Sequence, residues 1–327
     1  MNYVNQVKSK TERNIANTYF FILMLLLWGV LFLPESVIGE LYDSFVMNSV
    51  ASELIIVIPA LMLILIWHFM HTGREIPDES EQTTLISDRI MFRSVKPSTI
   101  LMTLVYVLTI MPLITLSNLI STLFVDNTVL EYGSDIVDMP VFTAVFSMAI
   151  MPAFCEELAF RGVVYGGYRK NCRPAGAILM SAFLFGLMHG NINQFVYTFL
   201  IGIALALLAE ATGSIWPTIL VHFLINLRAV VSMFILDSLY EGIFDTDLGD
   251  ETSAIYIIVY AVLSVITTLM AGAVISWISQ NEGRNNPLKT FINSKSYKEK
   301  RVSVWSLTLI IGILAAIAMI VLVEMSA

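Results

Sequence analysis

Long runs of apolar residues recur along this chain, and each is long enough to cross a bilayer core of roughly 30 Å. Apolar residues make up 57% of the 327 and charged residues only 13%, whereas a soluble domain of this length would carry about a quarter charged residues. The sequence therefore predicts an all-α fold, a polytopic integral membrane bundle of about nine transmembrane helices, with eight as the alternative count. The predicted spans are 18–34, 49–70, 99–124, 141–160, 174–190, 192–210, 216–236, 254–279 and 303–325.

The loops between these spans alternate in charge, and the alternation indicates how the chain is oriented. Three of them, 35–48, 125–140 and 237–253, contain acidic residues and no Lys or Arg. Because Lys and Arg concentrate in cytoplasmic loops, we expect the N-terminus to be cytoplasmic and the C-terminus to lie outside. The basic residues of the opposite loops are Lys8, Lys10, Arg13, Arg74, Arg89, Arg93, Lys96, Arg169, Lys170, Arg173, Arg284, Lys289, Lys295, Lys298, Lys300 and Arg301.

A cluster of charged residues interrupts the fourth span, which we expect to continue as helix to about residue 170. Glu157 and Arg161 are four residues apart, so they share a helix face in the order that favours an ion pair. This pair would leave the adjacent Glu156, which points about 100° away, free to exchange protons with water in an apolar cavity. The alternative is that all three residues form a structural charge cluster that holds helices together.

Polar residues also occur in the fifth and seventh spans. His189 ends the fifth span, and His222 and Asn226 are four residues apart on one face of the seventh. Taken singly, each could serve only to bridge helices by hydrogen bonds. At 1.5 Å per residue, Glu156 and His189 lie at a similar depth, about 21 and 22 Å above the ends of their helices, whereas His222 comes out at only about 9 Å. Tilt, or a loop 211–215 that re-enters the membrane, would have to close this gap.

Together these residues resemble the motif set of the CPBP family, which includes CAAX prenyl endopeptidases and bacteriocin-immunity or processing proteins of bacteria. Glu-Glu-x-x-x-Arg matches Glu156, Glu157 and Arg161; Phe-x-x-x-His matches Phe185 and His189; His-x-x-x-Asn matches His222 and Asn226. On this basis the chain divides into N-terminal transmembrane helices and loops (1–140), a CPBP-type intramembrane protease core (141–236) and C-terminal transmembrane helices (237–327).

The resemblance implies an intramembrane endopeptidase that hydrolyses peptide bonds of membrane-associated proteins or peptides. Glu156 would be the general base that activates water, His189 would hold and polarise that water, and His222 and Asn226 would donate hydrogen bonds to the oxyanion. Glu157 and Arg161 would orient the site.

A zinc mechanism uses some of the same atoms, because Glu156, His189 and His222 form a plausible ligand set with a bound water as nucleophile. However, the chain has no His-Glu-x-x-His motif, and an Asn in the fourth position is a poor zinc ligand. The sequence therefore favours a mechanism without a metal cofactor, with zinc as the alternative.

Two other classes of function remain open on the sequence alone, an ion-coupled transporter and a non-catalytic membrane immunity or scaffold protein. The expected partners are the lipid bilayer and a membrane-associated peptide or protein substrate, and no nucleic acid. The expected location is the plasma membrane of a bacterial cell, as a multi-pass protein.

Overall fold

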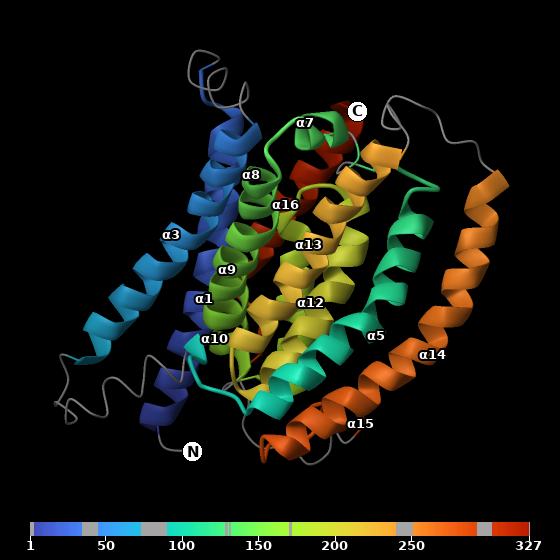
Figure 1. Ribbon diagram of the computed structural model, residues 1–327. Helices are drawn as coiled ribbons and strands as arrows, with labels where there is room; N and C mark the ends of the chain where they lie inside the picture. Colours follow the sequence, from blue (N-terminus) through green and yellow to red (C-terminus); the bar gives the residue numbers. More distant parts are fainter. Residues whose placement is uncertain are drawn as a thin grey trace.

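The computed structural model describes residues 3–34, 45–72, 90–127, 130, 132–169, 172–239, 251–292 and 303–326, and all regular structure in these ranges is helical (Figure 1). The predicted all-α fold is confirmed. In chain order the elements are α1 (Tyr3–Leu31), α3 (Phe45–Thr72), α5 (Pro97–Ser121), α7 (Gly133–Val137), α8 (Val141–Val145), the π-helix η1 (Phe146–Ile150), α9 (Met151–Glu157), the π-helix η2 (Leu158–Tyr165), α10 (Gly166–Arg169), α11 (Pro174–Met188), α12 (Ile192–Thr212), α13 (Trp216–Leu239), α14 (Glu251–Asn281), α15 (Lys289–Ile292) and α16 (Leu307–Ser326).

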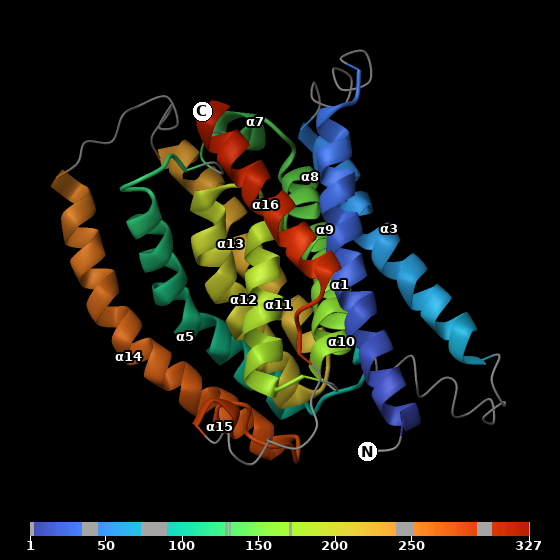
Figure 2. The ribbon, with the colours of Figure 1, turned by 180° about the vertical axis from the view of Figure 1, so that it is seen from behind.

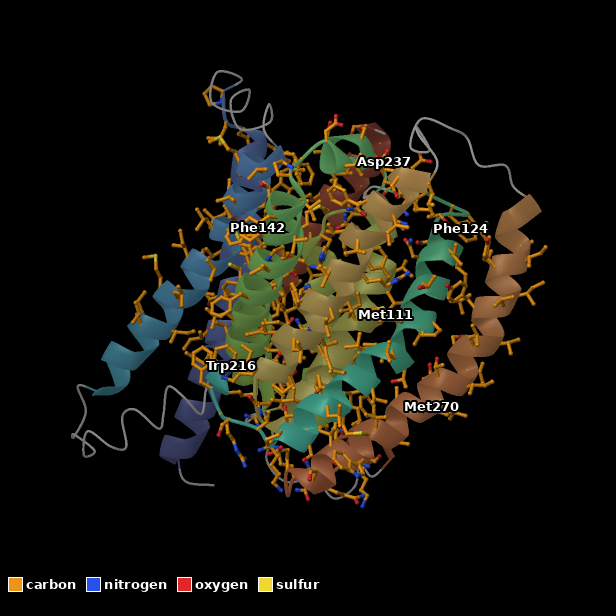
Figure 3. The ribbon with its side chains drawn as sticks, in the orientation of Figure 1. Met111, Phe124, Phe142, Trp216, Asp237 and Met270 are labelled. Atoms are coloured by element: carbon orange, nitrogen blue, oxygen red, sulfur yellow. The ribbon has the colours of Figure 1, made fainter. Side chains whose placement is uncertain are left out.

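Eight helices in the described residues are long and apolar enough to cross a membrane. The fourth of them runs from Val141 to Arg169, which confirms that helix continues past residue 160. The remaining predicted span, 174–190, forms the 15-residue helix α11, which is shorter than the roughly 20 residues of a full crossing. The outer surface carries large apolar side chains, among them Phe124, Phe142 and Met270 (Figure 3), as contact with lipid requires.

Successive long helices run in opposite directions across the bundle. The helix α1 begins at the lower end and α16 ends at the upper end, beside α7 (Figures 1 and 2). The short helix α11 runs antiparallel to its neighbour α12 and keeps this alternation. The fold therefore agrees with the predicted alternation of the loops, and the two ends of the described chain lie at opposite ends of the bundle.

The predicted basic loops meet at the lower end. The backbone amide of Ile215 donates to the carbonyl of Met91 at 3.0 Å, and that of Lys96 donates to the Glu282 carboxylate at 3.0 Å. Nearby, Arg284 donates from Nε to the carbonyl of Glu210 at 2.9 Å. Three segments that are distant in sequence are thus joined at one end of the bundle.

The first and last helices of the described chain pack together at the back of the bundle (Figure 2). Asn17 on α1 donates from Nδ2 to Ser306 Oγ at 2.6 Å, and Trp28 donates from Nε1 to the carbonyl of Ala315 on α16 at 3.0 Å. On the opposite side α5 packs against α14, and α5 bends partway along its length, where Pro112 interrupts the helical hydrogen bonds (Figure 1). The segment from α8 to α10 and helices α12 and α13 form the centre.

Candidate active site

The two predicted glutamates lie on α9, a seven-residue α-helix placed between the π-helices η1 and η2. Such π segments inside helices are rare and occur often at functional sites. Both glutamates are buried, with Glu157 fully enclosed and Glu156 7% exposed. All residues of η2, from Leu158 to Tyr165, are buried as well, so η2 lies in the interior of the bundle, whereas α9 also presents Phe154 at the surface.

The Glu157 carboxylate joins two helices through a single oxygen. Its Oε1 atom accepts from Arg161 Nη1 at 2.8 Å and from His222 Nδ1 at 3.0 Å. All three side chains are at least 95% buried, so the carboxylate offsets the arginine charge and also fixes the ring of His222. The predicted ion pair is therefore formed, and it also holds α13 against α9 and η2.

The Glu156 carboxylate lies on the other side of the same imidazole. Its Oε2 is 3.8 Å from His222 Nε2, too long for a direct hydrogen bond but short enough for one water molecule to contact both atoms. This Oε2 atom has no hydrogen-bond partner among the described residues. Since Nδ1 of His222 donates to Glu157, Nε2 is the atom that His222 presents toward Glu156.

The second histidine is held in a comparable way. His189 follows the last residue of α11, and its Nδ1 lies 2.9 Å from the carbonyl of Phe185. A carbonyl can only accept, so Nδ1 carries the proton and Nε2 remains available. The Phe185 ring contacts both imidazoles edge-on, with centroid distances of 5.2 Å to His189 and 5.9 Å to His222. The Arg161 guanidinium lies 4.6 Å from the centroid of the same ring.

One cavity of about 400 Å³ brings the predicted catalytic residues together. Glu156, His189, His222 and Asn226 all line it, although they come from three separate helical segments. Asn226 is one helical turn beyond His222, so its amide lies on the same wall. His222 thus reaches the same cavity as Glu156 and His189 despite the expected difference in depth. The turn Gly213–Ile215, with Gly213 in the left-handed conformation at φ 66°, is buried before α13 begins at the lower end of the bundle.

Sequence reasoning missed one acidic residue near this site. Glu53 on α3 is 6% exposed, and its Oε2 has no hydrogen-bond partner among the described residues. It interacts electrostatically with Glu156. Glu53 lies one turn from Ser49 and two turns from Phe45, which both line the cavity. The available signal was that Glu53 is the only charged residue in the predicted span 49–70.

The histidine orientation suits metal binding, since metal-ligating imidazoles usually donate their other N–H to a carboxylate or carbonyl. The spacing does not suit it. Within the described part of the chain, no three His, Cys, Asp or Glu side chains lie close enough to hold a metal ion together. In this arrangement Glu156, His189 and His222 do not form a three-ligand zinc site.

Comparison with known proteins places this site within a recognised family segment. The model of the family described as type II CAAX prenyl endopeptidase Rce1-like matches residues 138–228. A protein of Bacillus subtilis (strain 168) named "Putative membrane peptidase YdiL" is 26% identical over 83 residues, which are 25% of this chain and 34% of that protein. The match thus spans about a third of the curated relative, and no solved structure matches the chain.

These matches confirm the family resemblance expected from the three motifs. The matched residues contain α9, η2, α11, α12 and the first half of α13, which carry Glu156, Glu157, Arg161, His189, His222 and Asn226. Glu53 lies outside them. The segment 138–228, which supplies most of the polar wall of the cavity, is thus similar to the Rce1-like family of type II CAAX prenyl endopeptidases.

Proposed function

We propose that this protein is an intramembrane endopeptidase that hydrolyses a peptide bond of a membrane-associated protein or peptide. One observation carries the proposal: Glu156 Oε2 and His222 Nε2 lie 3.8 Å apart on a cavity wall. Two such atoms can share one water molecule. The family of the matched segment and the peptidase name of the Bacillus relative support the same reaction class.

In the proposed reaction Glu156 is the general base. It removes a proton from the shared water molecule while the water oxygen bonds to the scissile carbonyl carbon. The carbonyl oxygen becomes an oxyanion, and the Asn226 amide donates to it. His222 donates from Nε2 when its ring carries a second proton, since Nδ1–H is already used by Glu157. His189 Nε2 helps to hold the water.

Collapse of the tetrahedral intermediate completes the reaction. The carbon–nitrogen bond breaks, and Glu156 returns the proton it took to the departing nitrogen. The products are a carboxylic acid and an amine, and Glu156 is restored as a carboxylate. Glu157 and Arg161 stay ionised throughout and keep the His222 ring in place, a positioning role that their buried contacts suit.

This mechanism uses only side chains of the chain itself. The zinc alternative would need Glu156, His189 and His222 to act as three ligands of one ion. Since these three groups are not close enough to act as ligands together, we route no step through a metal.

The proposal is tested by comparing peptide N-termini in membranes from cells that express wild-type protein or Glu156→Gln at equal levels. We expect new N-termini with wild type only, because the amide cannot accept the proton of water. Loss of rate should be about 10²- to 10⁴-fold, the range of general-base catalysis. Identical N-termini with both proteins, in a host known to respond to the protein, would instead favour transport or a non-catalytic role. Repeating the comparison with a zinc chelator tests whether cleavage requires zinc.

A further inference from the structure

Arginine side chains gather around one carboxylate at the lower end of the bundle, away from the residues of the proposed reaction. Arg169 ends α10, about 20 Å along the helix from Glu156. Arg284 lies three residues beyond the end of α14, and Glu210 lies near the end of α12. Arg169 Nε is 3.3 Å from Oε2 of Glu210, and Arg284 Nη2 is 4.0 Å from its Oε1. Oε2 also accepts from the Tyr165 hydroxyl at 2.6 Å.

The Arg284 guanidinium lies against the buried turn between α12 and α13. Its Nε donates to the backbone carbonyl of Glu210 at 2.9 Å, and a Cβ atom at Gly213 would collide with its Nη1. The next residue of this turn, Ser214, donates from its hydroxyl to the backbone carbonyl of Arg93. A third arginine is thus anchored to the same turn by its backbone, which leaves its side chain exposed.

The positive charge of this cluster exceeds that of the acid it surrounds. Among the described residues, Glu210 is the only acid in an ion pair with these arginines, so three cations share one anion. At 4.0 Å, Arg284 Nη2 is too far from the carboxylate for a hydrogen bond. Partial burial and the charges of the other two arginines lower the pKa of the Arg284 guanidinium, and Glu210 opposes this effect. A second anion here would relieve the repulsion.

Another acid at this end, Glu282, is already used by α5. Its Oε1 accepts from the backbone amide of Lys96 at 3.0 Å and from the Thr99 hydroxyl at 2.5 Å. The carboxylate therefore satisfies donors in the first turn of α5 and forms no ion pair with the described arginines. Lys96 is exposed, so its side chain adds positive charge to the same end of the bundle.

Exposed aromatic side chains mark this end as the level of the lipid headgroups. Trp216, labelled in Figure 3, begins α13 three residues after Gly213, and its ring stacks on that of Phe92 with centroids 5.5 Å apart. Trp277 lies one turn before the end of α14. Trp216 and Trp277 are 49% and 41% exposed. Because Trp side chains concentrate at membrane–water interfaces, the arginine cluster lies beside the headgroup layer.

The chemistry of this cluster suits a phosphate group at the membrane surface. A guanidinium can bind two phosphate oxygens through parallel hydrogen bonds. Basic pockets between transmembrane helices bind anionic lipid headgroups. A zwitterionic headgroup brings its own cation, which the excess positive charge here disfavours, whereas an anionic headgroup neutralises that charge and keeps its acyl chains beside the exposed aromatic rings.

We propose that Arg93, Arg169 and Arg284 form a binding site for the headgroup phosphate of an anionic phospholipid, whose acyl chains lie along Phe92 and Trp216. The site is separate from the cavity described above, so it does not rest on the proposed endopeptidase function. A free phosphate ester has the same headgroup chemistry without the apolar contact, and an acidic protein segment offers carboxylates in place of phosphate. The test separates these ligands.

The test is a lipid titration of the full chain in neutral detergent, with bound lipids counted by native mass spectrometry. Phosphatidylglycerol, which is anionic, is compared with phosphatidylcholine, which is zwitterionic, and both carry the same acyl chains. We expect phosphatidylglycerol to bind about 5- to 30-fold more tightly, the effect of one or two arginines near a membrane surface. Glycerol phosphate and a Glu-rich peptide at the same concentration should not displace the bound lipid.

Substitution of the arginines assigns the preference to this site. Arg284→Gln should remove most of it, and Arg284→Lys should keep part, because lysine retains the charge but not the paired hydrogen bonds. Arg93→Gln leaves the backbone contact with Ser214 in place, so it should weaken the preference without lowering thermal stability. Arg173→Gln, which removes an exposed arginine outside the cluster, is the matched control and should keep the whole preference.

Several results would overturn the proposal. These are equal affinity for the two lipids, displacement of the lipid by glycerol phosphate or by the Glu-rich peptide, and a preference that survives both Arg284→Gln and Arg93→Gln. An equal loss with Arg173→Gln would also overturn it, since the attraction would then belong to the whole basic surface. Cleavage plays no part in these measurements, so failure of the proposed endopeptidase function would leave their outcome unchanged.

Discussion

The Glu157 carboxylate determines more of the site than its neighbour Glu156 does. One of its oxygens accepts from both Arg161 and His222, so a single atom neutralises a buried cation and selects which nitrogen of the imidazole faces the cavity. In the proposed reaction such a residue acts through another group, and its buried contacts also join α9 to η2 and α13.

Replacement of Glu157 by Gln should therefore destabilise the protein as well as inactivate it. The substitution leaves the Arg161 charge buried without a counter-ion, a loss of about 3–5 kcal/mol for a fully buried pair. Thermal unfolding in detergent measures this loss. The double variant Glu157→Gln/Arg161→Met, which removes both charges, should recover much of the stability but not the activity. If the double variant were no more stable than the single one, the ion pair would not be the cause.

The sequence predicts which of these residues lie on one helix face because their spacing is local. Glu157 with Arg161 and His222 with Asn226 are each four residues apart, and helix geometry puts such pairs on one face whatever the tertiary fold. The contact between Glu157 and His222, and the burial of Glu53 beside Glu156, depend on how helices pack. No periodicity within a single helix encodes them.

Close packing of α11 against α12 is the main element-level feature that supports the site. A Cβ atom at Gly202 would lie 2.8 Å from the Ala182 Cα atom and 3.2 Å from its carbonyl oxygen. The Gly202 carbonyl also accepts from Arg161 Nη2 at 3.4 Å. The glycine thus lets two helices approach closely, and this approach places His189 over the cavity.

We expect Gly202→Ala to lower the free energy of unfolding by about 1–3 kcal/mol, because the added methyl group overpacks the α11–α12 contact. Gly176→Ala is the control, since Gly176 lies on α11 but has open space around its Cβ position. Thermal unfolding of both variants in the same lipid gives the comparison. Equal midpoints for the two variants would show that the helices can separate without cost.

The length of α11 shows that an apolar composition alone does not establish a transmembrane span. Its 15 residues are as apolar as those of a transmembrane helix, so the sequence predicts a span over 174–190. In the structure the helix ends at Met188, and Gly190 turns the chain with φ 72°. Because α12 and η2 pack around it, an apolar sequence is needed for burial in protein, which hydropathy does not distinguish from burial in lipid.

At the scale of the whole molecule, the alternation of helix direction supports the charge pattern of the loops. The described basic residues Arg93, Arg169 and Arg284 lie at the lower end. At the upper end, Asp126 follows the last residue of α5, and Asp237 lies near the end of α13. The distribution of Lys and Arg predicts that the lower end faces the cytoplasm.

Cysteine labelling in intact cells tests this orientation. A membrane-impermeant maleimide should label Asp126→Cys from outside and should label Arg173→Cys only after the membrane is opened. The two native cysteines, Cys155 and Cys172, are buried, so their background labelling is expected to be low. The reverse pattern would place the N-terminus outside.

The pairing of Glu157 with Arg161 inside one helix also bears on how the protein is made. This segment carries its own counter-ion before any other helix has packed against it, so these two residues add no net charge when it enters the bilayer. Its insertion need not wait for α13, which is synthesised later. His222 can then contact a carboxylate that is already neutralised by Arg161. The four-residue spacing of Glu157 and Arg161 thus allows the helices to insert in the order in which they are synthesised.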